Sequence, residues 1–365
     1  MIKICFIINN LKLGGAERQF VELIRGLDKK KYDVTVYLYA ENEPMFYDEL
    51  LDIDNIHIFR EKLQSRFIIF KIIKAILRIR LFLRLNRFDL VQTTLVMNGA
   101  LVRVAAFGLE NYKNRIVTSL RKNFDNYLMH EKLIESILIN NSYSISNTKF
   151  SAGKFNEYLK GYFNSKIFYI YNGFDTTRFI KKKYESISPK VIGSVGRMSL
   201  EKNQIQILRA LVCFGKELTL YIIGDAGFEK DKLENFAQNH LPGFDIKIIS
   251  HVSDIENYYC QFDIFILSSL YEGCPNVLFE AMLSGCMCII SESANTDAFV
   301  IDGVNGLVYD NSDNGLAECI KNAYQIYPTD QGEKIIENGY KYARDNFSIS
   351  KMIKQYDQLF NKIIM

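Results

Sequence analysis

Short apolar runs alternate with longer amphipathic segments along most of the chain, a pattern typical of α/β proteins. Between the runs, apolar residues recur at helical spacing, as they do in 20–27. The pattern predicts two α/β halves, each a parallel sheet with crossover helices. The expected strands of the first half are 2–8, 32–39, 56–59, 91–94, 115–119, 142–145 and 167–170, and those of the second are 191–195, 220–223, 246–249, 264–267 and 286–290.

Composition fits this organisation, since 365 residues of which 48% are hydrophobic suffice for two domains of ordinary size. The polar and charged segment 181–189 between the halves is interpreted as part of a linker. A formal net charge of only +3 argues against nucleic acid as a partner of the whole chain. Seven cysteines without a C-x-x-C pair favour reduced thiols in a cytoplasmic setting, and the N-terminal apolar run is too short for a signal peptide.

The stretch from 264 to 285 predicts a strand, a loop and a helix, with Asn276 as the residue that caps the helix. In a parallel sheet, such a loop lies at the carboxyl end of a strand, where ligands bind. The free N–H groups that begin the helix suit a phosphate. We therefore expect Glu272 and Glu280 to accept hydrogen bonds from hydroxyl groups on either side of it, those of a sugar and a ribose.

Two further loops follow predicted strands and carry groups that suit phosphate. Arg197 and Lys202 lie five residues apart after the strand at 191–195, which suits a diphosphate, because arginine binds phosphate through two N–H groups and lysine as a point charge. Gly14 and Gly15 follow the first strand and precede a helix, the layout of a phosphate-binding turn. Their spacing is not G-x-G-x-x-G, so an ordinary tight turn remains an equal alternative.

Residues 64–88 combine Phe, Ile and Leu with seven Lys or Arg and contain no acid. The charges interrupt the segment too often for a transmembrane helix. A basic amphipathic helix is typical of elements that contact an anionic membrane surface. The alternative is a crossover helix packed on the sheet with its cations extending to water, and one helix can serve both purposes.

The loop and helix around Glu272 resemble the E-x7-E motif of GT-B retaining glycosyltransferases of family 4, also called group 1. The family pattern S-x-x-E-G-x-P-N-V-x-x-E-A-M-x-x-G is matched by Ser269, Glu272, Gly273, Pro275, Asn276, Val277, Glu280, Ala281, Met282 and Gly285. Arg197 and Lys202 resemble the G-R-x4-K-N segment of this family, and Gly14 and Gly15 resemble its Gly-Gly-Ala-Glu. Asn172-Gly173-Phe174-Asp175 is similar to the N-G-x-D that ends its first domain, and 305–309 to its N-G-x-L-V.

The resemblance implies a GT-B fold, with two Rossmann-like domains that face a central cleft. It implies an acceptor-binding domain at 1–175, a nucleotide-sugar domain at 190–345 and a helix at 346–365 that returns to the first domain. The donor is expected to be a UDP-hexose or UDP-N-acetylhexosamine and the acceptor a lipid-linked saccharide at the inner face of the membrane. Glu272, with the backbone of 273–276 (Gly-Cys-Pro-Asn), would hold the donor sugar, Glu280 the ribose, and Arg197 and Lys202 the diphosphate, with no metal and no protein nucleophile. Val277 is a further expected substrate-binding residue.

One departure concerns the residue after the predicted strand at 115–119. Relatives often carry a histidine there, whereas this chain has Leu120-Arg121-Lys122, so Arg121 is a candidate substrate contact in its place. The four histidines are scattered without metal-ligand spacing, and Asp52-Ile-Asp54 falls in a polar turn at no evident ligand site. A glycoside hydrolase, a UDP-sugar epimerase and a non-catalytic nucleotide-sugar sensor remain alternatives.

Overall fold

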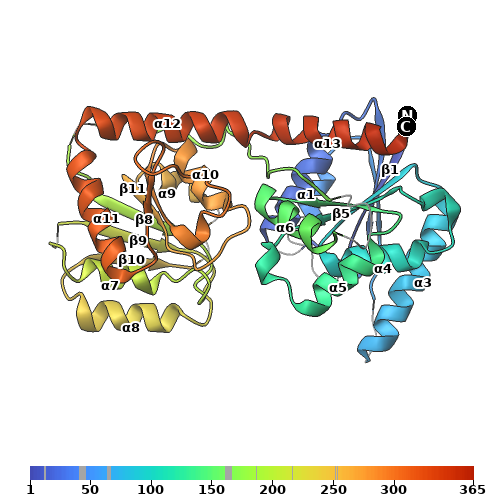
Figure 1. Ribbon diagram of the computed structural model, residues 1–365, viewed down its shortest axis with the longest axis horizontal. Coiled ribbons are helices and arrows are strands. Elements are labelled where there is room, and N and C mark those ends of the chain that lie inside the picture. The colour runs from blue at the N-terminus through green and yellow to red at the C-terminus, as the bar shows by residue number, and fades with distance from the viewer. Residues whose placement is uncertain are drawn as a thin grey trace. The chain divides into compact units, whose positions relative to one another are not determined.

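The computed structural model describes residues 1–11, 14–40, 47–63, 67–160, 167–185, 187–215, 217–250, 252 and 254–365, and it divides into two compact units (Figure 1). The first unit comprises 1–173 with 349–365, and the second comprises 174–348. The described residues of 181–189, which the sequence analysis interprets as part of a linker, therefore belong to the second unit. Lys182 explains why, because its backbone N–H donates to Ser284 and its ammonium pairs with Asp263.

The first unit contains a parallel sheet of seven strands in the order β3-β2-β1-β4-β5-β6-β7. Side chains along β1 point alternately to the two faces of the sheet, so the core of this unit has two parts. Ile4 and Phe6 face one helical layer, while Cys5 and Ile7 face the other. The strands are β1 (Ile2–Ile8), β2 (Tyr32–Leu38), β3 (Ile56–Arg60), β4 (Leu90–Thr94), β5 (Ile116–Leu120), β6 (Tyr143–Ser146) and β7 (Ile167–Tyr169).

Helices cover both faces of this sheet (Figure 1). One layer contains α1 (Gly15–Gly26) and α13 (Ile349–Ile364), which contact each other. Lys31 and Tyr32 fasten α13 by binding Asp357 at 2.5 and 2.7 Å. The opposite layer contains α3 (Ile68–Asn86), α4 (Val96–Ala106) and α5 (Met129–Leu138), and smaller elements are α2 (Tyr47–Leu51), η1 (Glu110–Tyr112), η2 (Phe124–Asn126) and α6 (Lys149–Tyr158).

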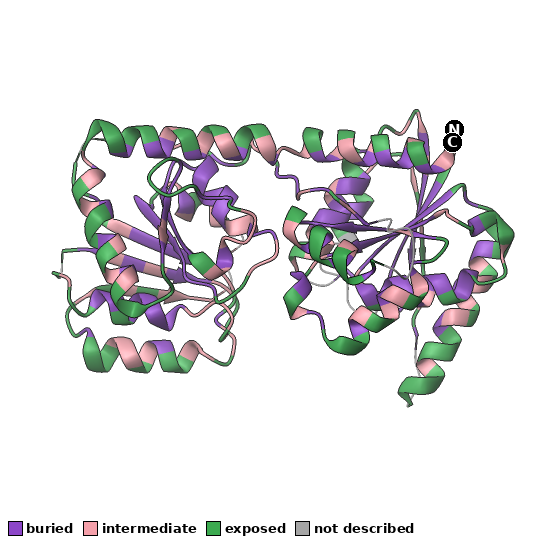
Figure 2. Cartoon of the chain, in the orientation of Figure 1, coloured by how far each residue is buried: buried purple, intermediate pink, exposed green. Residues whose placement is uncertain are grey.

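The second unit contains a parallel sheet of six strands in the order β10-β9-β8-β11-β12-β13. Figure 2 shows that its strands, like those of the first unit, are largely buried. The strands are β8 (Val191–Val195), β9 (Thr219–Ile223), β10 (Asp245–Ile249), β11 (Ile264–Leu267), β12 (Met287–Ser291) and β13 (Leu307–Tyr309). The helices are α7 (Ile205–Leu211), α8 (Lys230–His240), α9 (Ile255–Tyr259), α10 (Asn276–Leu283), η3 (Glu292–Ala294), α11 (Asp313–Ile326) and α12 (Asp330–Asn346).

The strand order reverses once in each sheet, between β1 and β4 and between β8 and β11. At such a switch point the two neighbouring strands send their loops to opposite sides, which leaves a crevice at the carboxyl edge of the sheet. Both sheets are therefore Rossmann-like. No helix in the described part of the chain is long and apolar enough to cross a membrane.

Candidate functional site

An ion pair spans the switch point of the second unit. Lys202, in the loop after β8, donates from Nζ to Oε1 of Glu272, in the loop after β11, at 2.5 Å. Both side chains are mostly buried. The pair joins the two loops that a ligand at this edge of the sheet would contact.

Serine side chains hold this pair in place. Ser269 Oγ donates to Glu272 Oε1 at 2.7 Å, and the carbonyl of Ser269 accepts from Ser291 Oγ at 2.6 Å. Ser268 Oγ donates to the carbonyl of Lys202 at 3.0 Å. The β8 and β11 loops are thus tied together through both backbone and side chains, which favours a preformed site.

The loop after β9 approaches the β8 loop so closely that only glycine fits at two positions. A Cβ at Gly224 would lie 2.1 Å from the carbonyl oxygen of Gly196, and one at Gly227 would lie 2.0 Å from that of Met198. Arg197 is exposed between these two contact points. The glycines therefore fix the path of the loop that carries Arg197 and Lys202.

Helix α10 begins at Asn276 itself, with Pro275 in the capping position, so the prediction that Asn276 caps the helix was wrong by one residue. The reason is that the carbonyl of Pro275 accepts from the N–H of Leu278 at 3.0 Å and so starts the first turn. Gly273 and Cys274 complete the loop before the helix. Cys274 is buried, and Val277 is half-buried. The N-terminus of α10 therefore lies at the carboxyl edge of the sheet, as expected for an anion site.

Glu280 lies one turn into α10 and is only 6% exposed. Its Oε2 accepts a hydrogen bond from the hydroxyl of Tyr259 at 2.9 Å. Burial raises the pKa of the Tyr259 hydroxyl well above its usual range, and the charge of Glu280 raises it further. Tyr259 therefore remains a donor that orients this carboxylate.

Gly14, Gly15 and Arg121 lie in the first unit, at the carboxyl edge of its sheet. Gly14 precedes α1, and a Cβ there would meet Glu17 Oε2 at 2.4 Å. Burial raises the pKa of the Glu17 carboxyl, although its own backbone N–H and the charge of Arg121 oppose that shift. Arg121 Nη1 donates to Asn172 Oδ1 at 2.7 Å, while its Nε is buried with no hydrogen-bond partner among the described residues.

Comparison with known proteins identifies the family of the chain that carries these two sheet edges. The profile "Glycosyltransferase Family 4" matches residues 13–178, and the profile "Glycosyl transferases group 1" matches residues 175–342. The chain belongs to the group 1 glycosyltransferases. Its predicted GT-B fold is confirmed by solved structures of this class, such as Anabaena Alr3699/HepE in complex with UDP and glucose (TM-score 0.82, 21% identity, covering 99% of this chain and 100% of that one).

Two curated relatives align with this glycosyltransferase over almost the full length of both chains. An uncharacterized glycosyltransferase of Methanocaldococcus jannaschii is 26% identical over 96% of both chains. A Campylobacter jejuni enzyme is 23% identical over 100% of this chain and 99% of its own length. That enzyme is named an alpha-1,4-N-acetyl-D-galactosaminyltransferase acting on a GalNAc-containing diNAcBac-PP-undecaprenol.

The structure places four residues beside the candidate site that the sequence analysis did not select as site residues. Ser269, Tyr259, Glu17 and Asn172 each bind or face a selected residue. Ser269, Glu17 and Asn172 lie within the family motifs named above, so their motif positions could have identified them from the sequence. Tyr259 lies outside every motif, and only the packing of α9 against α10 reveals it. Within the described ranges, no group of three or more His, Cys, Asp or Glu could hold a metal.

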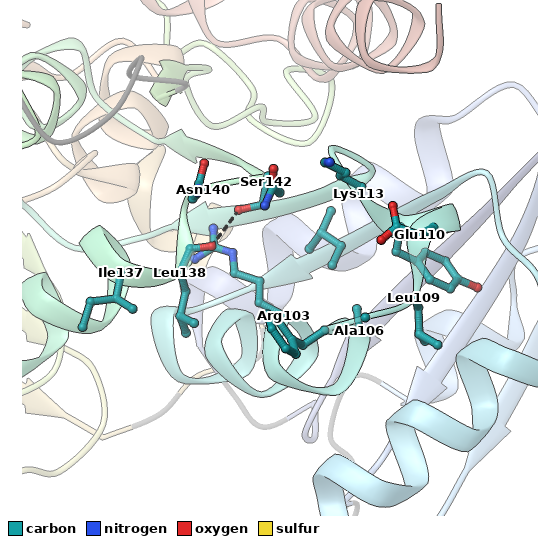
Figure 3. A pocket seen from close by; sticks show the side chains of 14 residues that line it. Arg103, Ala106, Leu109, Glu110, Lys113, Ile137, Leu138, Asn140 and Ser142 are labelled. Carbon is teal, nitrogen blue, oxygen red and sulfur yellow. Dashed lines mark hydrogen bonds between the residues drawn. The ribbon is translucent and has the colours of Figure 1, made fainter.

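A cavity of about 410 Å³ lies elsewhere in the first unit, between the ends of α4 and α5 and the start of β5 (Figure 3). It is lined by Arg103, Leu109, Ile116, Leu138 and Ser142 among others. These residues lie near the amino ends of β5 and β6, at the edge of the sheet opposite to Arg121. The cavity is therefore separate from the glycosyltransferase site.

Proposed function

We propose that this glycosyltransferase moves a hexose or N-acetylhexosamine from a UDP-sugar to a lipid-linked saccharide, with retention, in the assembly of a surface polysaccharide or glycolipid. The observation that carries the proposal is the Lys202–Glu272 pair at the β8/β11 switch point. The Campylobacter relative supports a lipid-linked acceptor, and the UDP complex of the structural neighbour supports the donor class.

In this proposal Lys202 and Arg197 neutralise the diphosphate that leaves the sugar. An ammonium has three donors, so Lys202 can keep its bond to Glu272 while it binds a phosphate oxygen. The exposed guanidinium of Arg197 adds two N–H groups that match phosphate geometry. With the N-terminus of α10, they place positive charge where negative charge develops on the leaving group.

The two glutamates would bind hydroxyl groups. Glu272 and the backbone of 273–276 would hold the donor sugar, because this carboxylate is fixed by Lys202 and Ser269 beside the phosphate position. Glu280, oriented by Tyr259, would accept from the ribose hydroxyls. Neither glutamate acts as a nucleophile here. The leaving phosphate would help to take the proton of the acceptor hydroxyl on the same face of the sugar.

The acceptor would contact the first unit at Gly14, Gly15 and Arg121. Gly15 is exposed and carries no side chain, so a ligand can approach the backbone at the start of α1 beside the carboxylate of Glu17. Arg121 is half-buried, and its Nε has no hydrogen-bond partner among the described residues, so its guanidinium keeps donor capacity for a substrate oxygen. Arg121 thus takes the place that relatives give to histidine.

A donor panel tests the proposal. We expect UDP release from a UDP-hexose or UDP-N-acetylhexosamine when membrane lipid extract is present, and little release without an acceptor. Cleavage of glycosides without a donor would instead indicate a hydrolase, and conversion of the donor without an acceptor would indicate an epimerase. Tight UDP binding without turnover would indicate a non-catalytic nucleotide-sugar sensor.

We also propose that α3 contacts an anionic membrane from the side facing away from the sheet. Ala75, Ile79 and Leu83 bury one face of α3 on the unit, so the alternative of a packed crossover helix also holds. Residues 64–66 of the predicted basic segment lie outside the described residues. The opposite face exposes Phe70, Ile73, Leu77 and Leu81 beside Lys74 and Arg84.

Reversal of charge at Lys71, Lys74 and Arg84 to glutamate is expected to reduce co-sedimentation with phosphatidylglycerol vesicles, since each cation near the surface contributes about 1 kcal/mol. Arg78 is left unchanged because it pairs with Glu61 at 2.8 Å. A matched variant, with Lys321, Lys334 and Lys341 reversed in the second unit, should bind as the parent does. Equal binding by both variants would refute contact through α3.

A further inference from the structure

Helix α5 exposes an apolar stripe to solvent and buries its acidic side chains, the reverse of an ordinary surface helix. Met129, Leu133 and Ile137 form one stripe at four-residue spacing, and they are 75%, 52% and 61% exposed. The two acids of the helix face inward instead, with Glu131 8% and Glu135 0% exposed. A soluble surface normally shows the opposite arrangement, so this helix is built for a surrounding that is less polar than water.

Both buried acids are compensated, which shows that the orientation of α5 is specified. Glu135 forms a two-bond ion pair with Arg103 of α4, at 2.7 and 3.1 Å, and also accepts from Ser144. Glu131 binds Lys122 at 3.1 Å and the backbone N–H of Leu128 at 2.9 Å. Rotation of the helix to bury its apolar stripe would break these bonds. The exposed stripe is therefore a feature of the stable fold.

The neighbouring helices continue the apolar surface. α4 contacts both α3 and α5, and it exposes Met97 and Val104 with the half-buried Leu101 between them. Figure 2 shows exposed segments along α3 and α5 in the same layer of the first unit. We call this surface the three-helix face; it comprises Phe70, Ile73, Leu77 and Leu81 of α3, Met97 and Val104 of α4, and Met129, Leu133 and Ile137 of α5.

Charge decides which occupant suits the three-helix face. Within α3, α4 and α5, all of whose residues the structure describes, every acid is buried, while Lys74 and Arg84 are exposed and Lys132 is half-buried with its ammonium over the ring of Phe124. An apolar surface this broad is unusual for a monomer in water. A second copy would bring its own cations against these cations, whereas an anionic bilayer offers an apolar interior beneath a negative surface.

We propose that the three-helix face, and not α3 alone, rests on an anionic lipid bilayer, with the α5 stripe inserted below the headgroups. The inference deepens the proposed membrane contact of α3, but it does not depend on the sugar chemistry. Lys74 and Arg84 contact lipid phosphates at the edge of the apolar stripes. The carboxyl edge of the sheet, where α4 and α5 begin, is then held near the membrane surface.

The chain has no tryptophan, so a single one can report on insertion. In Leu133→Trp, we expect the emission to shift to shorter wavelength and to be quenched by brominated lipid when phosphatidylglycerol vesicles are added. Val212→Trp, at an exposed position of the second unit, should show neither change. Unchanged Leu133→Trp emission while the protein co-sediments with vesicles would overturn the proposal, as would a shift that follows protein concentration without lipid, because that marks a second copy.

A second variant tests the energetics without adding charge. Met129→Gln, Leu133→Gln and Ile137→Gln together keep a helix-forming sequence and should weaken vesicle binding at least about tenfold. The matched control replaces Ile180, Val212 and Ile301 of the second unit by glutamine, and its vesicle binding should not change. Equal binding by both triple variants would refute insertion of α5. Neither result depends on UDP release, so failure of the proposed transfer reaction would be seen separately.

Discussion

Replacement of Lys202 by methionine is expected to lower sugar transfer by about 10²–10³-fold, the usual effect of removing one preorganised charge-stabilising donor. Methionine keeps the length and apolar stem of lysine but cannot bind the diphosphate or Glu272. The loss should fall on kcat at least as strongly as on KM, because the charge on the leaving phosphate is greatest in the transition state. Transfer from the donor identified in the UDP-release panel is the measurement.

Lys202→Met also leaves Glu272 without its cation in a mostly buried position, so part of any loss could come from altered folding. The double variant Lys202→Met with Glu272→Gln separates the two effects. It should recover thermal stability, since no unpaired carboxylate remains, but it should not recover transfer. Lys321→Met, at an exposed position of α11, is the control. Transfer by Lys202→Met within twofold of the parent would contradict the assigned role.

Replacement of Arg103 by leucine is expected to destabilise the first unit by about 3–5 kcal/mol, because it leaves Glu135 charged and unpaired in the core. The side chains of Arg103 and Glu135 are 4% and 0% exposed, so water cannot compensate for the lost bonds. Hydrogen exchange in peptides from β4, β5 and β6 measures this loss within the first unit itself.

The double variant Arg103→Leu with Glu135→Leu should regain most of this stability, since it removes both charges. Arg209→Leu, which breaks the exposed pair between Arg209 and Asp313, should change stability by less than about 1 kcal/mol. Similar exchange protection in Arg103→Leu and the parent would show that the buried pair does not stabilise the first unit.

Most strands were predictable from the sequence because their apolar runs are short and are followed by glycine or polar loops. The central runs, such as 2–8, 191–195 and 264–267, match β1, β8 and β11 in full. Their neighbours in space were not predictable in the same way. β8 and β11 lie side by side although β9 and β10 separate them along the chain, and only the folded sheet reveals that Lys202 meets Glu272 there.

Two other features depended on contacts that no local pattern shows. Lys182 resembles a linker residue in the sequence, yet it belongs to the second unit because Asp263 and Ser284 lie beside it. On α5, the spacing of Met129, Leu133 and Ile137 indicates a helix equally well whichever way the stripe points. Its outward direction depends on Arg103 and Lys122, which attract the two glutamates inward from other elements.

The placement of α13 in the first unit has a consequence for biosynthesis. Met352, Tyr356 and Phe360 complete the core that also contains β1, although nearly the whole chain separates them. During translation the second unit, which is continuous in sequence, can fold as soon as it leaves the ribosome. The first unit must wait until α13 has been made, and a nascent chain that stops at Ser348 would leave the apolar layer over α1 open to chaperones and proteases.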